Sequence, residues 1–268
     1  MANVTRFVLT DNWLLKDFEP GHGEKLCAFN PDHHTGDWIK ASVPGVVHLD
    51  LMKEGLIPDP FFGLNEKEVV WVEGREWWYR NDFEASSELV SKQKVELCFH
   101  GLDTFATVWL NGKKLGQTDN MFIPWRYDVK TLIVDGRNVL AVKFDPPTSV
   151  LDALEASKGR MGAAFYTGRV YGRKCQCSFG WDWGLRLPTS GVWKPVEVVA
   201  YDLAKIEHVT TKVKSVTLST AELVLEAEVH CTKYFSAEIA FEVSLNGQRF
   251  ARTFSKRLVT GKNTVEAH

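Results

Sequence analysis

Short segments of alternating apolar and polar residues run along most of the chain. An alternation of period two over four to eight residues, rich in β-branched and aromatic side chains and broken by Gly, Asn, Asp and Pro, is typical of β-strands. Only His48–Glu54 and Ser149–Lys158, each followed by a glycine, have the pattern of a helix. In the first part of the chain the clearest predicted strands are Lys94–Phe99, Phe105–Leu110, Asn138–Phe144 and Val192–Val199.

Two Asn-Gly dipeptides predict hairpin turns. Asn111-Gly112 lies between Phe105–Leu110 and Lys114–Thr118, and Asn246-Gly247 lies further along the chain. Asn-Gly suits the two positive-φ positions of a type I′ turn, so the flanking strands should pair antiparallel. Because strands do not alternate with helices, the pattern predicts an all-β sandwich for residues 1–204 rather than an α/β fold.

The strand pattern starts again after Asp202. An immunoglobulin-like sandwich usually takes about 100 residues and seven strands, whereas 64 residues, 205–268, follow Ala204. We therefore predict a partial immunoglobulin-like sandwich there and interpret the chain as a fragment of a longer protein. The predicted strands of this second domain are Ile206–Val213, Glu222–His230, Ala237–Leu245 and Arg249–Phe254.

The composition is that of an ordinary folded protein with balanced charge. Of 268 residues, 44% are hydrophobic and 25% charged, and 32 Lys and Arg against 34 Asp and Glu give a net charge of −2. A nucleic-acid partner would favour a basic patch, and no apolar stretch approaches the roughly 20 residues that cross a bilayer. We expect a soluble chain with neither a nucleic-acid nor a membrane partner.

Cysteine usage gives no sign of a disulfide framework. The five cysteines are odd in number and scattered, which favours a reducing, cytoplasmic compartment slightly and leaves the localisation open. No second Cys/His pair completes a zinc pattern, so packing is the predicted role of the closest two, and neither a metal nor a cofactor is expected. The cysteines are Cys27, Cys98, Cys175, Cys177 and Cys231.

The densest candidate site is the triplet Trp181, Asp182 and Trp183. Sugars stack their apolar C–H faces on aromatic rings and donate hydroxyl hydrogen bonds to carboxylates, so this triplet offers both kinds of contact in one place. The alternative is structural: the indoles fill the end of the sandwich and Asp182 caps a turn. Three basic residues nearby are candidates for orienting Asp182 or bonding a ligand: Arg173, Lys174 and Arg186.

The tryptophans and one long loop add to this picture. All ten tryptophans lie between Trp13 and Trp193, which separates an aromatic-rich first domain from the rest. Ser42–Glu68, rich in Pro and Gly, predicts a long ordered loop that either carries function or covers the sandwich. Its Asn65-Glu66 pair also occurs at the acid/base of many retaining glycosidases, but that chemistry needs a second carboxylate about 5 to 5.5 Å away, so we assign no catalytic residue.

Four stretches in order resemble the N-terminal region of β-mannosidases in glycoside hydrolase family 2. They are SVPGVVHLDLMKEGLIPDPFFGLNE, EWWYRNDFEA, FHGLDTFATVWLNGKKLGQTDNMFIPWRYDVK and GRKCQCSFGWDWGLRLPTSGVWKPVEV. The resemblance covers about residues 8–204, and the GWDWG and PFFGLNE segments favour the mannosidase branch. Leu185 stands where the family commonly has proline, and loss of a fixed φ predicts a looser loop.

The resemblance implies a jelly-roll, galactose-binding-like domain, then an immunoglobulin-like sandwich, then a (β/α)₈ barrel with both catalytic glutamates. Such a barrel takes about 250 residues, so we expect it to be absent here and this chain alone to be inactive. In the family the Trp-Asp loop reaches the mouth of the barrel and helps to bind the terminal mannose. That nominates Trp181, Asp182 and Trp183 as substrate-binding residues.

The sequence is therefore interpreted as the non-catalytic N-terminal part of a retaining β-mannosidase. Its implied partners are a terminal β-mannoside or another carbohydrate and the catalytic barrel of the parent chain. Two alternatives remain: a free-standing carbohydrate-binding module, and a structural domain that docks against the barrel. An exposed apolar patch on the face that carries Trp181 would favour docking.

Overall fold

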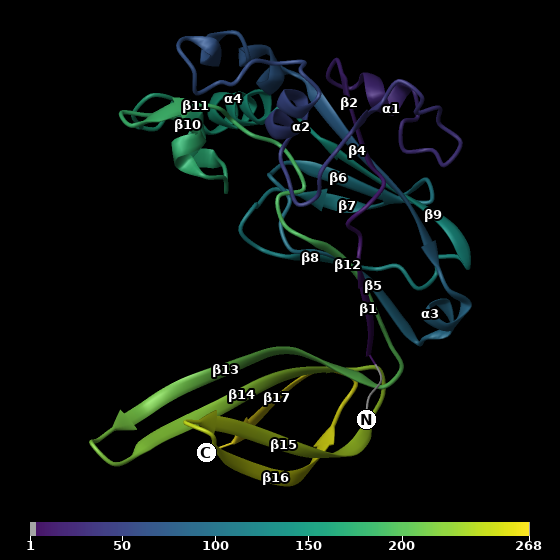
Figure 1. The fold of residues 1–268 in the computed structure, drawn as a ribbon, viewed down its shortest axis with the longest axis vertical. Coiled ribbons are helices and arrows are strands. Elements are labelled where there is room, and N and C mark those ends of the chain that lie inside the picture. Colours follow the sequence, from purple (N-terminus) through teal and green to yellow (C-terminus); the bar gives the residue numbers. More distant parts are fainter. Residues whose placement is uncertain (1–3, 268) are drawn as a thin grey trace. The chain divides into compact units, whose positions relative to one another are not determined.

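A computed structural model describes residues 4–267 as a chain of strands with few and short helices (Figure 1). The predicted all-β class is confirmed. Contacts between residues divide the chain into two compact units, which we describe separately. The first unit comprises residues 6–91 and 95–199, and the second comprises residues 200–267 with the short segments 4–5 and 92–94.

The larger sheet of the first unit has six strands in the order β3-β2-β4-β9-β6-β7, and all neighbours are antiparallel. Its central strands β4, β9 and β6 are buried along most of their length, because a second sheet and several loops cover their two faces. The strands are β2 (Trp13–Phe18), β3 (Ile39–Lys40), β4 (Glu76–Ala85), β6 (Ala106–Leu110), β7 (Lys113–Thr118) and β9 (Gly136–Phe144).

The second sheet of the sandwich has four strands in the order β1-β12-β5-β8. Its strands are β1 (Val4–Val8), β5 (Lys94–Phe99), β8 (Trp125–Asp128) and β12 (Val196–Tyr201). The predicted strand Val192–Val199 therefore begins later than expected. Pro195 has no N–H to give to a ladder, and the carbonyl of Val192 instead accepts a hydrogen bond from the N–H of Gly45, so this part of the segment serves as a connection.

Stacked aromatic rings fill the space beside the six-stranded sheet. The rings of Trp78 and Trp109 stack with centroids 5.1 Å apart, and the ring of Phe29 also stacks with that of Trp109, at 5.4 Å. Glu76 is fully buried, and it accepts hydrogen bonds from the Trp78 indole and from the N–H groups of Gly21 and Gly23. These hydrogen bonds satisfy a buried carboxylate and hold the segment with Gly21 and Gly23 against the six-stranded sheet.

The Asn-Gly hairpins are confirmed, and the helix prediction is incomplete. Asn111 has φ 49° and Gly112 has φ 76°, at the turn that joins β6 to β7. The two predicted helices are present as α2 (Val47–Lys53) and α4 (Pro147–Lys158). The prediction of only two helices is wrong, since it missed α1 (His22–Lys25) and α3 (Ser87–Ser91). Each of these helices is about one turn long, which is too short to show a helical period in the sequence.

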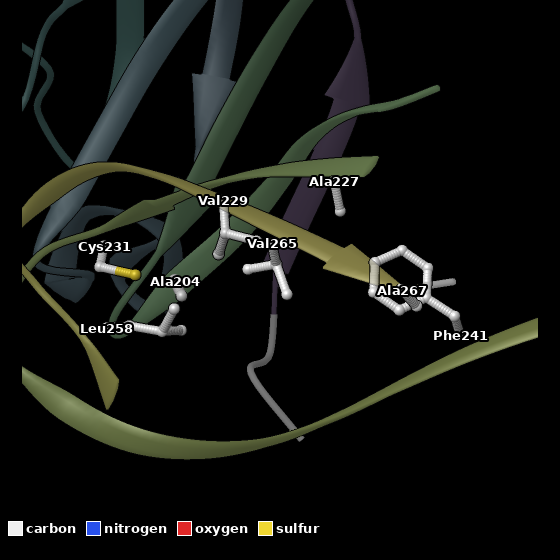
Figure 2. Close-up of a cluster of buried hydrophobic side chains, with 8 residues drawn as sticks. All are labelled: Ala204, Ala227, Val229, Cys231, Phe241, Leu258, Val265 and Ala267. Atoms are coloured by element: carbon white, nitrogen blue, oxygen red, sulfur yellow. The ribbon is translucent and has the colours of Figure 1, made fainter. Parts of the chain in front are cut away.

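The second unit consists of two small antiparallel sheets, in the orders β13-β14-β17 and β15-β16. Eight buried side chains form its core, with Phe241 of β15 and Val265 of β17 among them (Figure 2). Asn246 (φ 50°) and Gly247 (φ 79°) make the turn between β15 and β16. The strands are β13 (Ala204–Val216), β14 (Ala221–Cys231), β15 (Phe235–Leu245), β16 (Gln248–Leu258) and β17 (Gly261–Ala267).

A buried ion pair lies in the first unit, next to the start of β6. The ammonium of Lys174 and the carboxylate of Asp103 are both shielded from solvent, with side-chain exposures of 0% and 1%. Lys174 also donates to the carbonyl of Thr189 at 2.7 Å, and the Thr189 hydroxyl donates to Asp103 at 2.7 Å. Burial lowers the pKa of Lys174, and the interaction with Asp103 opposes that shift. Together with Thr189, the pair joins three separate segments of the chain.

Two further buried polar side chains, His48 and Asp50, lie on α2. This helix is part of Ser42–Glu68, the segment predicted to be a long ordered loop. One carboxylate oxygen of Asp50 accepts the N–H of Ser42 at 2.8 Å, whereas the other oxygen and Nδ1 of His48 have no hydrogen-bond partner. Burial raises the pKa of Asp50 from 3.8 to about 6. Burial, together with the charge of Lys174, lowers the pKa of His48 from 6.5 to about 4.

Replacing Lys174 by Met should destabilise the chain strongly. The substitution leaves the Asp103 carboxylate buried without its cation, which costs about 3 to 5 kcal/mol of unfolding free energy. The matched control is Lys16→Met, because Lys16 pairs with the exposed Asp37 at 3.1 Å and such pairs contribute about 1 kcal/mol or less. Urea unfolding of the two variants measures both losses; equal losses would contradict the importance of the buried pair.

The two groups on α2 should give opposite pH dependences of stability. Folded Asp50 holds a proton that the unfolded chain releases between about pH 4 and 6, so its contribution to stability falls as the pH rises. Folded His48 lacks a proton that the unfolded chain binds there, so its contribution rises with pH. In the wild-type chain the two slopes largely cancel.

Single variants separate the two slopes. In Asp50→Asn the unfolding free energy should rise by about 2 to 3 kcal/mol from pH 4 to 6.5, because only the His48 effect remains. In His48→Gln the unfolding free energy should fall by about 2 to 3 kcal/mol from pH 4 to 6, because only the Asp50 effect remains. Urea unfolding across this range measures both. Slopes of the same sign in the two variants would refute the assignment.

Candidate functional site

The triplet Trp181, Asp182 and Trp183 lies at the tip of a small hairpin. Strand β10 (Phe179–Trp181) pairs antiparallel with β11 (Gly184–Arg186), and Trp181 is opposite Gly184. Asp182 and Trp183 are the two residues of the turn, and both are exposed, Trp183 at 74%. The hairpin projects beside α4 in Figure 1. The side chains of the tip therefore point away from the core, and Trp183 does not fill the end of the sandwich.

Trp181 is held between two neighbours. The guanidinium of Arg169 lies 4.8 Å from the centre of the indole, and the ring of Phe165 lies 5.4 Å from it. Arg169 belongs to the 3-10 helix η3 (Thr167–Tyr171) and is only 7% exposed. A cation over an indole face contributes about 0.5 to 2 kcal/mol, more where the cation is desolvated. The orientation of Trp181 is thus restrained, although 38% of its surface stays accessible.

The base of the hairpin is anchored in the apolar core. Phe179 is 1% exposed and packs with Phe105 and Leu151. The ring of Tyr166 lies 5.1 Å from that of Phe179, and its hydroxyl donates to Asp152 at 2.6 Å. Burial and this hydrogen bond raise the pKa of Tyr166. A buried first residue and an exposed tip make the hairpin a short arm on a fixed support.

Two of the three basic residues expected near Asp182 have other partners. Arg186 donates to Glu73 at 2.6 Å, and Lys174 is committed to Asp103. Burial raises the pKa of Glu73, and Arg186 opposes that shift. Arg173 is exposed at the surface. The expectation that Lys174 and Arg186 orient Asp182 is therefore wrong, because each is drawn to a more buried carboxylate, where a charge needs a partner more.

Exposed apolar side chains lie on the hairpin and on segments that precede or form the 3-10 helix η2 (Val70–Gly74) or follow α4 in the chain. The ion pair of Arg186 with Glu73 ties the hairpin to η2, and α4 contacts η2 as well. Figure 1 shows these elements at one end of the first unit. We call this set of residues the apolar end: Leu56, Phe61, Phe62, Leu64, Val70, Trp71, Met161, Phe165, Trp181 and Trp183.

Sequence reasoning missed several of these residues. Phe61 and Phe62 are 77% and 75% exposed, in the loop that leads to the 3-10 helix η1 (Asn65–Lys67). Two adjacent aromatic residues between Pro60 and Gly63 were the available signal. The amide of Asn65 donates to the carbonyl of Asp59 at 2.8 Å, so this residue of the Asn-Glu pair serves to close the loop. Nothing in the sequence marked Arg169 as a neighbour of Trp181.

The hairpin tip presents an open surface rather than a closed cavity. Four grooves in the described part of the chain, with volumes from about 200 to about 670 Å³, are lined by residues other than 181–183. Within residues 4–267 no three His, Cys, Asp or Glu side chains cluster as a metal site would require. No helix there has the length and apolar character of a membrane span. Asp182 thus lies outside all four of these grooves.

Comparisons with known proteins agree with this fold. Residues 27–194 match the family described as "Glycosyl hydrolase 2 galactose-binding domain-like". The chain is 35% identical over 261 residues to β-mannosidase B of Emericella nidulans, covering 94% of this chain and 29% of that protein. It thus spans less than a third of the length of this relative.

Solved structures give the same result. The crystal structure of β-D-mannosidase from Dictyoglomus thermophilum superposes with a TM-score of 0.88 at 37% identity, over 98% of this chain and 30% of that one. An exo-chitosanase from Amycolatopsis orientalis shares the fold, with a TM-score of 0.70 at 20% identity over 98% of this chain and 28% of that one. The chain therefore belongs to glycoside hydrolase family 2, within its galactose-binding-like N-terminal region.

Proposed function

We propose that this chain is the non-catalytic N-terminal part of a retaining β-mannosidase and that its β10–β11 hairpin helps to shape the subsite for the terminal mannose. The observation that carries the proposal is the exposed Asp182 between two indoles, on an arm whose base is buried. The similarity to proteins named β-mannosidase supports the substrate class. Hydrolysis itself is assigned to a separate catalytic barrel.

The proposed roles follow from the chemistry of the three side chains. Asp182 is exposed and has no charged partner among the described residues, so its oxygens can accept hydrogen bonds from two sugar hydroxyls. Trp181 supplies an apolar wall whose orientation Arg169 restrains. Trp183, the more exposed indole, supports the wall or contacts the neighbouring domain.

The proposal also assigns the two domains of the chain. Residues 1–204 would be the galactose-binding-like domain and residues 205–268 part of an immunoglobulin-like sandwich, with residues 1–3 and 268 outside the described structure. The contacts separate the chain close to that boundary, at residue 200. In this arrangement the first domain carries the sugar-binding arm, and the second acts as a spacer towards the barrel.

Docking against the barrel is a second candidate function, and the apolar end favours it. Ten large apolar side chains, each at least 38% exposed, lie on three segments; the ion pair of Arg186 and Glu73 and the ring contact of Phe165 with Trp181 connect these segments. Exposed apolar side chains that form one surface usually mark an interaction site. The two functions are compatible, because a surface that docks beside the hairpin would also bring a second wall to Asp182.

A free-standing carbohydrate-binding module is the remaining alternative. A module needs a complete binding surface of its own, whereas residues 181–183 line none of the four described grooves. Calorimetry of the chain with mannose and with manno-oligosaccharides separates these functions. Binding with a dissociation constant near 1 µM, about −8 kcal/mol, would favour the module; heats too small to fit would favour a shared subsite.

The substitution Asp182→Ala should lower activity far more than stability in an enzyme that joins this chain to its catalytic domain. Loss of two charge-assisted hydrogen bonds, about 1.5 kcal/mol each, predicts a fall in kcat/KM of about 100-fold. The unfolding free energy should change by less than about 0.5 kcal/mol, because the side chain is exposed.

The matched control is Asp135→Ala, since Asp135 is another exposed aspartate of the same unit, far along the chain from the hairpin. This variant should keep both its activity and its stability. Hydrolysis of a chromogenic β-mannoside and urea unfolding measure the two effects. If Asp182→Ala lost stability and activity in equal measure, Asp182 would be a structural turn residue and the proposal would fail.

A further inference from the structure

Two thiols face each other just before the hairpin. The sulfur atoms of Cys175 and Cys177 are 3.2 Å apart, closer than two sulfurs in ordinary contact. Cys175 caps the 3-10 helix η4 (Gln176–Ser178), and the carbonyl of Cys175 accepts both the N–H of Ser178 at 3.2 Å and its hydroxyl at 2.7 Å. This closed turn brings the two side chains to the same side of the backbone.

The turn is held from both ends. The N–H of Cys175 donates to the sulfur of Met121 at 3.0 Å, and the amide of Gln176 donates to the carbonyl of Arg169 at 3.0 Å. On one side of the turn lies the buried Lys174, and on the other lies the buried Phe179. The 3.2 Å separation is therefore a property of an anchored segment rather than of a loose loop.

The pair is also accessible. Cys175 and Cys177 are both half-buried, whereas Cys98 and Cys231 are buried and Cys27 is exposed. The hydrogen bond to Cys175 and partial burial raise the pKa of Cys177. The thiolate is the form of a cysteine that attacks a disulfide, so the reaction needs a thiol that can lose its proton to solvent.

We propose that Cys175 and Cys177 form a dithiol modification site that reacts with low-molecular-weight disulfides such as oxidised glutathione. The function proposed above does not assign this site, and the inference does not depend on sugar binding. The fold positions the two sulfurs so that an intramolecular disulfide needs little further movement of the chain. Residues two apart on a tight turn also have Cα atoms near the range of about 4.4 to 6.8 Å that disulfides span.

The reaction proceeds in two exchanges. The thiolate of one cysteine attacks a sulfur of the small disulfide, which forms a mixed disulfide and releases one small thiolate. The second cysteine, as its thiolate, attacks the protein sulfur of that mixed disulfide and releases the other small thiolate. The two cysteines are oxidised, the small disulfide is reduced to two thiols, and the two cysteine protons end on those thiols.

Closure would act on the neighbouring hairpin. Phe179, the first residue of β10, follows Cys177 by two residues, so a shorter distance between the sulfurs changes the turn that leads into β10. Trp181 is the last residue of the same strand. The site is thus placed to couple the thiol redox state to the pose of the hairpin.

The test uses the whole chain with Cys27→Ser, which removes the exposed thiol outside the pair. The chain is equilibrated with mixtures of reduced and oxidised glutathione, its free thiols are alkylated, and intact mass and peptide mapping follow. We expect the loss of two hydrogen atoms at Cys175 and Cys177, with no bound glutathione. The amount of oxidised glutathione that oxidises half of the chain should be about tenfold lower than the amount that oxidises half of a peptide of residues 173–179. The reason is that the fold raises the effective concentration of one thiol near the other.

A matched variant identifies the second step. Cys27→Ser with Cys177→Ser should accumulate one mixed disulfide at Cys175, because the thiol that resolves it is missing. Unchanged urea unfolding of the reduced chain serves as the control for folding, and Cys177→Ala is the second choice if the serine variant unfolds. The proposal would be overturned if both thiols stayed reduced under conditions that oxidise the peptide, or if two glutathiones bound without closure.

Discussion

The buried ion pair between Lys174 and Asp103 is the constraint on which the candidate site depends. Lys174 precedes the β10–β11 hairpin and Thr189 follows it, and both bond to Asp103 beside the start of β6. The backbone of Asp103 also exchanges two hydrogen bonds with Gly191. Both stems of the hairpin are thereby fixed to the sandwich, although the hairpin itself has only three residues on each strand. A short hairpin of this kind is not stable in isolation, so its pose comes from the support.

Strong local signals made most of the fold predictable, and tertiary pairing accounts for what was missed. Lys94–Phe99 was predicted with the bounds that the structure shows, and Asn111-Gly112 forms the expected turn. These features depend on period and on backbone geometry, which a sequence displays directly. The partners of Lys174 and Arg186 depend instead on Asp103 and Glu73, each more than 70 residues away. No local pattern indicates such a pairing.

The candidate site was predictable as a set of residues but not as a surface. Trp181, Asp182 and Trp183 were visible as a triplet, whereas Arg169 and Phe165 meet Trp181 only through the fold. The resulting surface combines a restrained indole, an open carboxylate and exposed aromatic rings. Its tip residues line none of the four described grooves, and the proposed shared subsite would need a neighbouring domain to enclose a ligand.

The central claim is that this chain binds and positions while another domain carries out hydrolysis. The most direct measurement is the release of nitrophenol from a nitrophenyl β-mannoside by the purified chain alone. The account predicts no turnover above the blank at any enzyme concentration, because retaining hydrolysis needs two carboxyl groups about 5 to 5.5 Å apart in a substrate-binding cleft. Turnover that rises in proportion to the concentration of the chain, and that co-purifies with it, would contradict the account.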